Sequence, residues 1–292
     1  MCVCVGKFHS RMSTHHWGEY EPVGYFHGPI EDRPALHENR HVPVKHPPPQ
    51  VLTPAEAKVA QVTPGYCGWP IGTLRYFPLR ARAESLRLIL HYSGQPYFMH
   101  RVDFDEWSTV KPHMPKGQLP VWQSDDSEEL MPETADIAKH LAKISGRMGL
   151  MPADAAVAAE AARLFELCMD GPLGALNPLV NWTAKEEAIP RVARGVAEAL
   201  KALSSLKLPS PYFGGAQPHY ADFALWHCVD LCMLLDASSV NKLGNAYASW
   251  YKSIKEDRAI AAYLKCRPKA GTGRIGKPGS LIYSDDLGGN DR

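Results

Sequence analysis

The chain has 292 residues, 45% of them apolar, and 32 Lys and Arg against 31 Asp and Glu give a formal net charge of +1. This length allows one or two domains of ordinary size, and the near-neutral balance argues against the basic face that nucleic-acid binding needs. No stretch approaches the ~20 uncharged apolar residues of a membrane span. The 7 cysteines are too scattered for a disulfide scaffold, which favours a reducing, cytoplasmic compartment.

The first 70 residues are rich in Pro, His and Gly, with the run His46-Pro47-Pro48-Pro49 as the densest example. No apolar period of 2 or 3.6 residues persists there long enough to define a strand or helix. A segment that buries so little apolar surface does not offset the entropy lost on ordering. We therefore expect an irregular arm over residues 1–70.

The pattern becomes regular after this arm. The predicted elements are, in chain order, a strand at 73–77, a helix at 82–92, a strand at 97–102, a strand pair at 119–122 and 129–131, and a helix at 133–144. In the first helix Leu86, Ile89 and Leu90 fall on one face. This order of elements predicts a small mixed sheet with helices, an α/β domain over residues 71–148.

Beyond Pro152 the pattern is helical almost throughout. The expected helices cover 153–170, 191–206, 220–235, 245–255 and 259–264. We expect an all-α domain over residues 149–268, followed by a Gly-rich tail over 269–292.

Three segments stand in a fixed order along this regular part. They are Tyr76-Phe-Pro-Leu-Arg-Ala-Arg-Ala-Glu84, Gly117-Gln-Leu-Pro-Val121 and Ile260-Ala-Ala-Tyr-Leu-Lys-Cys-Arg-Pro268. Together they resemble the cytosolic glutathione S-transferases, most closely the sigma class, with Ala81 where Gly is usual. The resemblance covers residues 72–268. It implies a thioredoxin-like N-terminal domain, an all-α C-terminal domain, glutathione as co-substrate and a homodimer.

Catalysis in such an enzyme requires the glutathione thiol to ionise. A free thiol has a pKa near ~8.5, and lowering it by about two units corresponds to about 2.7 kcal/mol of preferential stabilisation of the thiolate. A tyrosine hydroxyl suits this task because it donates a hydrogen bond without adding a charge. By the resemblance, Tyr76 matches the catalytic tyrosine, and Arg82 matches the arginine beside its hydroxyl.

The resemblance also implies how the loops hold glutathione. Trp107 and Lys111 match the pair that binds the glycine carboxylate, and Gln118 lines the neighbouring loop. Leu119 matches the residue whose backbone pairs with the cysteinyl unit, and Pro120 matches the cis-proline that turns this backbone toward the ligand.

The γ-glutamyl end of glutathione is expected at a helix N-terminus. Glu133-Thr134 stands where the sigma class has Gln-Ser, so Thr134 keeps the hydroxyl and Glu133 adds a charge that can pair with the ammonium. Asp170 aligns with the acid that reaches across the dimer to the same ammonium.

Three functions follow from these residues. The leading one is a detoxifying glutathione transferase that conjugates the thiolate to small electrophiles. The alternatives are a glutathione-dependent isomerase of the prostaglandin D synthase type, and a non-catalytic transferase-like dimerisation module, which the Glu133-Thr134 change and the arms motivate. Cys228 and Cys232 lie one helical turn apart, but no histidine set completes a tetrahedral site, so no metal is expected.

Overall fold

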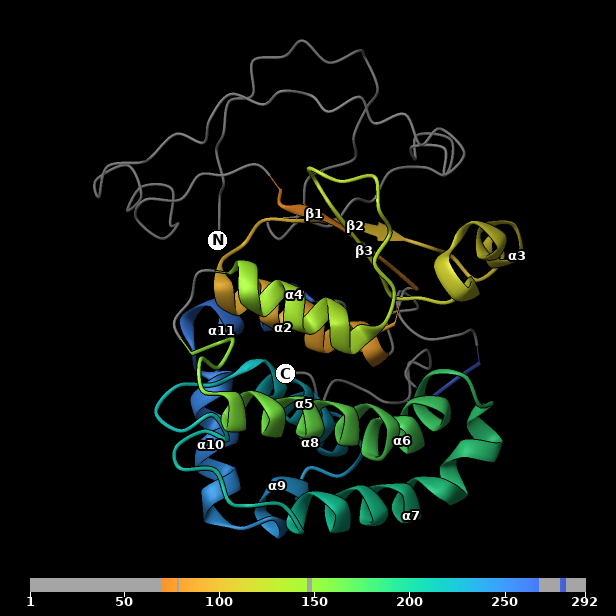
Figure 1. Cartoon of the computed structure of the whole chain (residues 1–292). Coiled ribbons are helices and arrows are strands. Elements are labelled where there is room, and N and C mark those ends of the chain that lie inside the picture. Colours follow the sequence, from red (N-terminus) through yellow and green to blue (C-terminus); the bar gives the residue numbers. More distant parts are fainter. Residues whose placement is uncertain (1–69, 78, 146–148, 268–278, 282–292) are drawn as a thin grey trace. The chain divides into compact units, whose positions relative to one another are not determined.

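The computed structural model describes residues 70–77, 79–145, 149–267 and 279–281 (Figure 1). The predicted arm over 1–70, apart from its last residue, and most of the Gly-rich tail lie outside these residues. The described residues form two compact units that interleave along the chain. The first unit contains the described residues up to Phe77 and those within Gly94–Pro132. The second unit contains the described residues within Pro78–Ser93 and within Glu133–Arg292. The predicted linear boundary at residue 148 stays a prediction.

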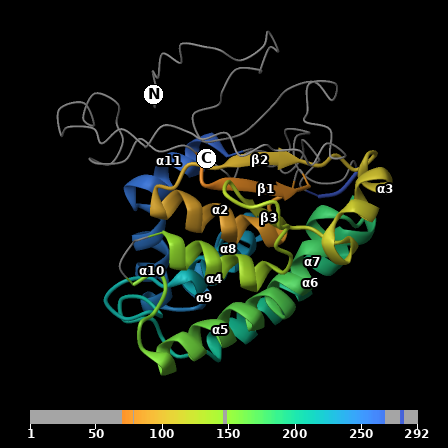
Figure 2. The ribbon, with the colours of Figure 1, turned by 45° about the horizontal axis from the view of Figure 1, so that its top comes forward.

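A three-stranded sheet forms the centre of the first unit. Its strands are β1 (Gly72–Tyr76), β2 (Phe98–Arg101) and β3 (Val121–Ser124), in the order β2-β1-β3 (Figure 2). β1 runs parallel to β2 and antiparallel to β3. Leu74 pairs with both Met99 and Trp122, and all three are buried, so they form an apolar row across the sheet.

Between β2 and β3 the first unit has three short helical turns. They are α3 (Trp107–Val110), η2 (Lys111–His113) and η3 (Pro115–Gly117). The predicted strand at 119–122 begins later than expected, because Pro120 has no N–H to give to a ladder. Its predicted partner at 129–131 contributes a single bridge, in which Met131 and Trp122 exchange backbone hydrogen bonds of 2.8 and 3.0 Å.

The second unit is helical in all its main elements. The helices are α2 (Ala81–Ser93), α4 (Thr134–Ile144), α5 (Ala155–Asp170), α6 (Pro172–Asn181), α7 (Lys185–Ser204), α8 (Tyr220–Leu235), α9 (Ser239–Lys242), α10 (Asn245–Lys255) and α11 (Arg258–Cys266). α6 continues the line of α5, and α7 runs back along α6 (Figure 1). The fold class therefore matches the predicted sheet and all-α parts.

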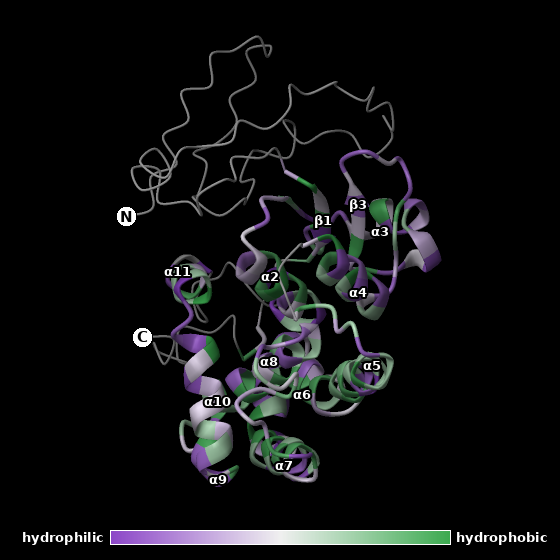
Figure 3. Cartoon of the chain, turned by 60° about the vertical axis from the view of Figure 1, so that its left-hand side comes forward, coloured by the Kyte–Doolittle hydropathy of each residue, from purple (hydrophilic) through white to green (hydrophobic). Residues whose placement is uncertain are grey.

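Helix α8 is the core of the second unit. Nearly all of its residues are buried, and it packs against α2, α5 and α7. Figure 3 shows hydrophobic residues along both α5 and α8. A helix that is apolar on most of its circumference belongs inside a protein, and α8 takes this place because its neighbours cover it on several sides.

A buried carboxylate fixes the start of α8. Asp222 is fully buried and accepts hydrogen bonds from the backbone N–H groups of Phe213, Gly214 and His219 at 2.9, 3.2 and 3.0 Å. The indole Nε1 of Trp250, on α10, donates to the same carboxylate at 2.8 Å. These bonds satisfy a group that would be costly to bury alone, and they tie the loop before α8 to α10.

Helix α6 is a finding that the sequence pattern did not predict. Pro172, Gly174 and Pro178 look like loop punctuation. Pro172 nevertheless occupies the first helical position, where a missing N–H costs nothing. The buried apolar face of Leu173, Leu176 and other residues then outweighs the interior proline.

Candidate active site

Tyr76 ends β1, at the carboxyl edge of the sheet. It pairs in register with Arg101, the last residue of β2, and its carbonyl accepts a hydrogen bond from the N–H of Val102 at 2.9 Å. On the other side Arg75 pairs with Val121, the first residue of the antiparallel strand β3. The segment that precedes β3 therefore enters the sheet at the same edge as Tyr76.

An aromatic cluster lies behind Tyr76. The ring of Phe77 meets that of Tyr76 edge-on with centroids 5.7 Å apart, stacks on Phe104 at 5.5 Å, and meets Trp107 edge-on at 5.1 Å. Because aromatic pairs add to the energy of simple burial, this cluster joins the end of β1 to the start of α3. Phe77 and Phe104 had no predicted role, and only their position beside the Tyr-Phe motif could have indicated one.

Polar contacts fix the loop that leads to Trp107. The Arg101 Nε donates to Asp103 Oδ1 at 3.0 Å, and Glu106 Oε1 accepts from the N–H of Asp103 at 2.9 Å. These contacts set the path of the chain between β2 and α3. Trp107 itself is half-buried at the first position of α3.

The predicted loop before β3 has the expected backbone. The Leu119–Pro120 peptide bond is cis, as predicted. Gln118 is exposed, Leu119 is half-buried and Pro120 is buried. Gly117 has φ of 58°, and a Cβ there would lie 3.3 Å from the Cε of Lys111. The Lys111 side chain therefore lies against this loop, and its role toward a ligand stays a prediction.

In the second unit the structure brings two predicted residues together. The Arg82 Nη2, in the first turn of α2, lies 3.3 Å from the Asp170 Oδ1, at the last residue of α5. Both side chains are accessible, with exposed fractions of 41% and 78%. The pair gives Arg82 a partner within one chain, while the role of Asp170 across a dimer stays a prediction.

Two helix starts of the second unit have unusual backbones. Ala81, at the start of α2, has φ of 31°, a left-handed conformation that a Cβ disfavours. Glu133, the N-cap of α4, has φ of 69° and ψ of 116°. Thr134 follows as a buried first residue of that helix. Strained residues of this kind gather at ligand sites, and the role of Glu133 toward a ligand stays a prediction.

A buried charge cluster next to Arg82 was missed by the sequence analysis. Glu84, only 1% exposed, accepts from the Arg87 Nη1 and Tyr263 hydroxyl at 3.1 and 2.9 Å, and from the Arg267 Nη1 at 3.1 Å. Arg267 also donates through Nη2 to Asp230 Oδ2 at 2.9 Å. The cluster ties α2 to α8 and α11.

The charges of this cluster shift two pKa values. Burial alone would raise the pKa of Glu84, but Arg267 and Arg87 outweigh it and hold that pKa well below the ordinary carboxyl range. His227 is fully buried beside the cluster, and its burial lowers its pKa to about 4. At neutral pH Glu84 is therefore an anion and His227 is neutral.

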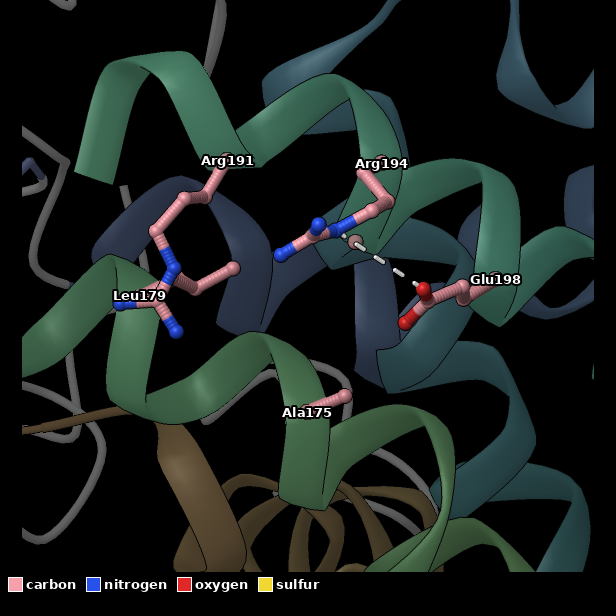
Figure 4. Close-up of a pocket in the computed structure, with 6 residues that line it drawn as sticks. Ala175, Leu179, Arg191, Arg194 and Glu198 are labelled. Atoms are coloured by element: carbon pink, nitrogen blue, oxygen red, sulfur yellow. Dashed lines mark ion pairs between the residues drawn. The ribbon is translucent and has the colours of Figure 1, made fainter. Parts of the chain in front are cut away.

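The second unit has a small hollow lined by other residues. It has a volume of about 170 Å³ and lies between α6 and α7 (Figure 4). Its lining residues are Ala175, Leu179, Arg191, Arg194, Gly195 and Glu198. The Arg194 Nε is 3.9 Å from the Glu198 Oε1, one turn further along α7. It contains none of the predicted site residues.

Two searches of the described residues bear on other functions. Among these residues no helix combines the length and the apolar character needed to cross a membrane. Nor do they bring together three or more His, Cys, Asp or Glu side chains in a group that could hold a metal ion.

Comparison with known proteins gives consistent matches. A model of the glutathione S-transferase C-terminal domain matches residues 181–267. Hematopoietic prostaglandin D synthase of Gallus gallus is 30% identical over 198 residues, which cover 67% of this chain and 96% of the relative. Among solved structures, the sigma-class glutathione S-transferase of Fasciola hepatica has a TM-score of 0.57 and 23% identity, covering 68% of this chain and 97% of that one. Rat hPGDS bound to a quinoline has the same TM-score and identity, and covers 68% and 98%.

Proposed function

Because the chain belongs to the glutathione S-transferase family, we propose that Tyr76 supplies the catalytic hydrogen bond to the glutathione thiolate, which attacks a small electrophile. The predicted family and its sigma-like character are confirmed, as is the glutathione transferase assignment. The identity of the reacting residues rests on the geometry of the site.

The observation that carries this proposal is the convergence at one edge of the sheet. Tyr76 ends β1, the Leu119–cis-Pro120 segment enters β3 at the same edge, and the chain leaving β2 leads to Trp107. A cysteinyl unit held by the backbone of Leu119 would present its sulfur toward the Tyr76 side of this edge. Lys111, which lies against the same loop, supplies a cation for the glycine carboxylate.

The second unit offers the groups expected for the γ-glutamyl end. The N-terminus of α4 has backbone N–H groups that favour a carboxylate, and Glu133, the N-cap of that helix, would supply a charge for the ammonium. Arg82 has the role of favouring an ionised thiol through its fixed charge, and its Nη2 lies 3.3 Å from the Asp170 Oδ1.

Tyr76→Phe tests the assignment. If the hydroxyl lowers the thiol pKa by about two units, from ~8.5 to ~6.5, its loss reduces kcat/KM for a chlorodinitrobenzene by about 25-fold at pH 7 and by about 100-fold well below pH 6.5. The pH profile then moves toward the ionisation of free glutathione, near ~8.5, so the deficit shrinks at alkaline pH.

The matched control is Tyr97→Phe. Tyr97 is also buried, but it precedes Phe98, which pairs with Thr73 at the opposite end of the sheet. This variant should retain the wild-type pH profile. Equal turnover by Tyr76→Phe and wild type across the pH range would remove Tyr76 from the mechanism.

We also propose the finer properties that accompany this function: a cytoplasmic detoxifying role and a homodimer. Light scattering of the full chain measures the dimer directly. An endoperoxide substrate separates transfer from isomerisation, because a transferase consumes glutathione in proportion to product, whereas an isomerase regenerates it.

A further inference from the structure

Two buried cysteines lie in contact between α5 and α8. Cys168 is in the last turn of α5 and Cys228 is in the middle of α8, and both side chains are fully buried. Their Sγ atoms are 2.9 Å apart, and the two residues are separated by 60 positions in sequence. Cys232 lies one turn further along α8 and is also buried.

The separation of the two sulfur atoms is close to that of a covalent bond. A disulfide has an S–S length of about 2.04 Å, so the atoms need to approach by only about 0.9 Å. We propose that Cys168 and Cys228 form an oxidation site, which a small hydroperoxide converts into a disulfide linking α5 to α8. The inference does not depend on the proposed glutathione chemistry.

The reaction balances with hydrogen peroxide as the oxidant. One sulfur attacks a peroxide oxygen, the O–O bond breaks, and a sulfenic acid and one water form. The second sulfur then attacks the sulfenic sulfur, the S–S bond forms, and the hydroxyl leaves with the remaining thiol proton as a second water. The cysteine pair loses two electrons, and one peroxide is reduced to two waters.

Burial determines which oxidant can act and how fast. A bulky disulfide such as oxidised glutathione does not reach sulfur atoms that are fully buried, whereas hydrogen peroxide is close to water in size. Burial and the contact with Cys168 raise the pKa of the Cys228 thiol well above its ordinary value. The thiol form is the poorer nucleophile, so oxidation should be slow and should quicken as pH rises.

Cys232 is the natural internal control. It shares α8 with Cys228, and burial raises its pKa to about 12. It has no comparable contact with a second sulfur among the described residues, whereas Cys168 and Cys228 touch. The geometry therefore selects one pair out of three buried thiols.

Peptide mapping of the full chain tests the site. The reduced protein is treated with hydrogen peroxide under native conditions, denatured, alkylated and digested with trypsin without reductant. The residues of interest fall in two tryptic peptides, 164–185 and 208–242. We expect these to appear joined, lighter by two hydrogen atoms than their sum, and to separate again with dithiothreitol.

Three variants assign the bond. Cys232→Ser should retain the joined peptides, whereas Cys168→Ser and Cys228→Ser should each lose them. The melting temperature of the wild type should rise on oxidation, because the bond closes a long loop in the unfolded chain. Cross-links confined to other cysteines, or Cys168 and Cys228 both still alkylated after peroxide treatment, would overturn the proposal. Fragmentation of the joined wild-type peptides, which shows whether Cys228 or Cys232 carries the alkyl group, decides this even if a variant does not fold.

Discussion

Replacing Arg267 with Met is the sharpest test of the buried charge cluster. The guanidinium is 7% exposed and donates to Glu84 at 3.1 Å and to Asp230 at 2.9 Å. Breaking a buried ion pair by removing one partner typically costs about 3–5 kcal/mol. Glu84 keeps Arg87 and Tyr263 as partners, so we expect the lower end, a loss of about 3 kcal/mol in the free energy of unfolding.

Urea unfolding followed by tryptophan fluorescence measures this loss. The slope of the free energy against urea should stay unchanged, which shows that the variant unfolds from a similarly compact state. The control is Arg258→Met, an exposed arginine on the same helix α11, which should change stability by less than about 0.5 kcal/mol.

A double-mutant cycle with Glu84→Gln isolates the pair itself. Residues in direct contact couple by about 0.5–3 kcal/mol, and burial places this pair in the upper half of that range. Additive effects of Arg267→Met and Glu84→Gln, or a loss under about 1 kcal/mol for Arg267→Met, would refute the reasoning that the charges depend on each other.

Two further predictions concern pH and backbone strain. His227 has a folded pKa of about 4 against about 6.5 when unfolded. The unfolded chain therefore binds more protons, and the free energy of unfolding falls by about 3 kcal/mol as pH drops from 6.5 to 4. His227→Phe should remove this part of the fall in unfolding free energy, as measured by urea unfolding at several pH values between 6.5 and 4. An unchanged fall would contradict the assignment. Ala81→Gly removes the Cβ that disfavours the φ of 31°. The free energy of unfolding should stay unchanged or rise by up to about 1 kcal/mol, and the melting temperature should follow it. Ala83→Gly, inside the same helix, should cost about 1 kcal/mol, so equal losses in both variants would argue against strain at Ala81.

The sequence predicted the regular elements where a local period existed. The face of Leu86, Ile89 and Leu90 gave α2, and these three side chains are fully or almost fully buried. The same local signal was absent for α6, because its prolines and glycines are typical of a loop. Helix formation there depends on packing against α5 and α7, which no window of sequence contains.

The residues of the candidate site were likewise predicted where they stand in a short motif, and the buried charge cluster beside Arg82 in the sequence was not predicted. Tyr76 and the Leu119–Pro120 segment were predicted because each sits in a short motif. Glu84 was not assigned a role, because a charged helical residue usually faces solvent. Its decisive partners, Tyr263 and Arg267, are 179 and 183 positions away, so only the folded chain shows that this carboxylate is buried and paired.

The interleaving of the two units has a consequence for any attempt to divide the protein. The chain passes between the units after Phe77, after Ser93 and after Pro132, so no single cut yields two self-sufficient fragments. A fragment ending at residue 148 would carry α2 without α8, leaving Tyr92 without the ring of Phe223 that it packs against at 4.9 Å. The apolar side of α2 would then face water, and such a fragment should aggregate rather than fold.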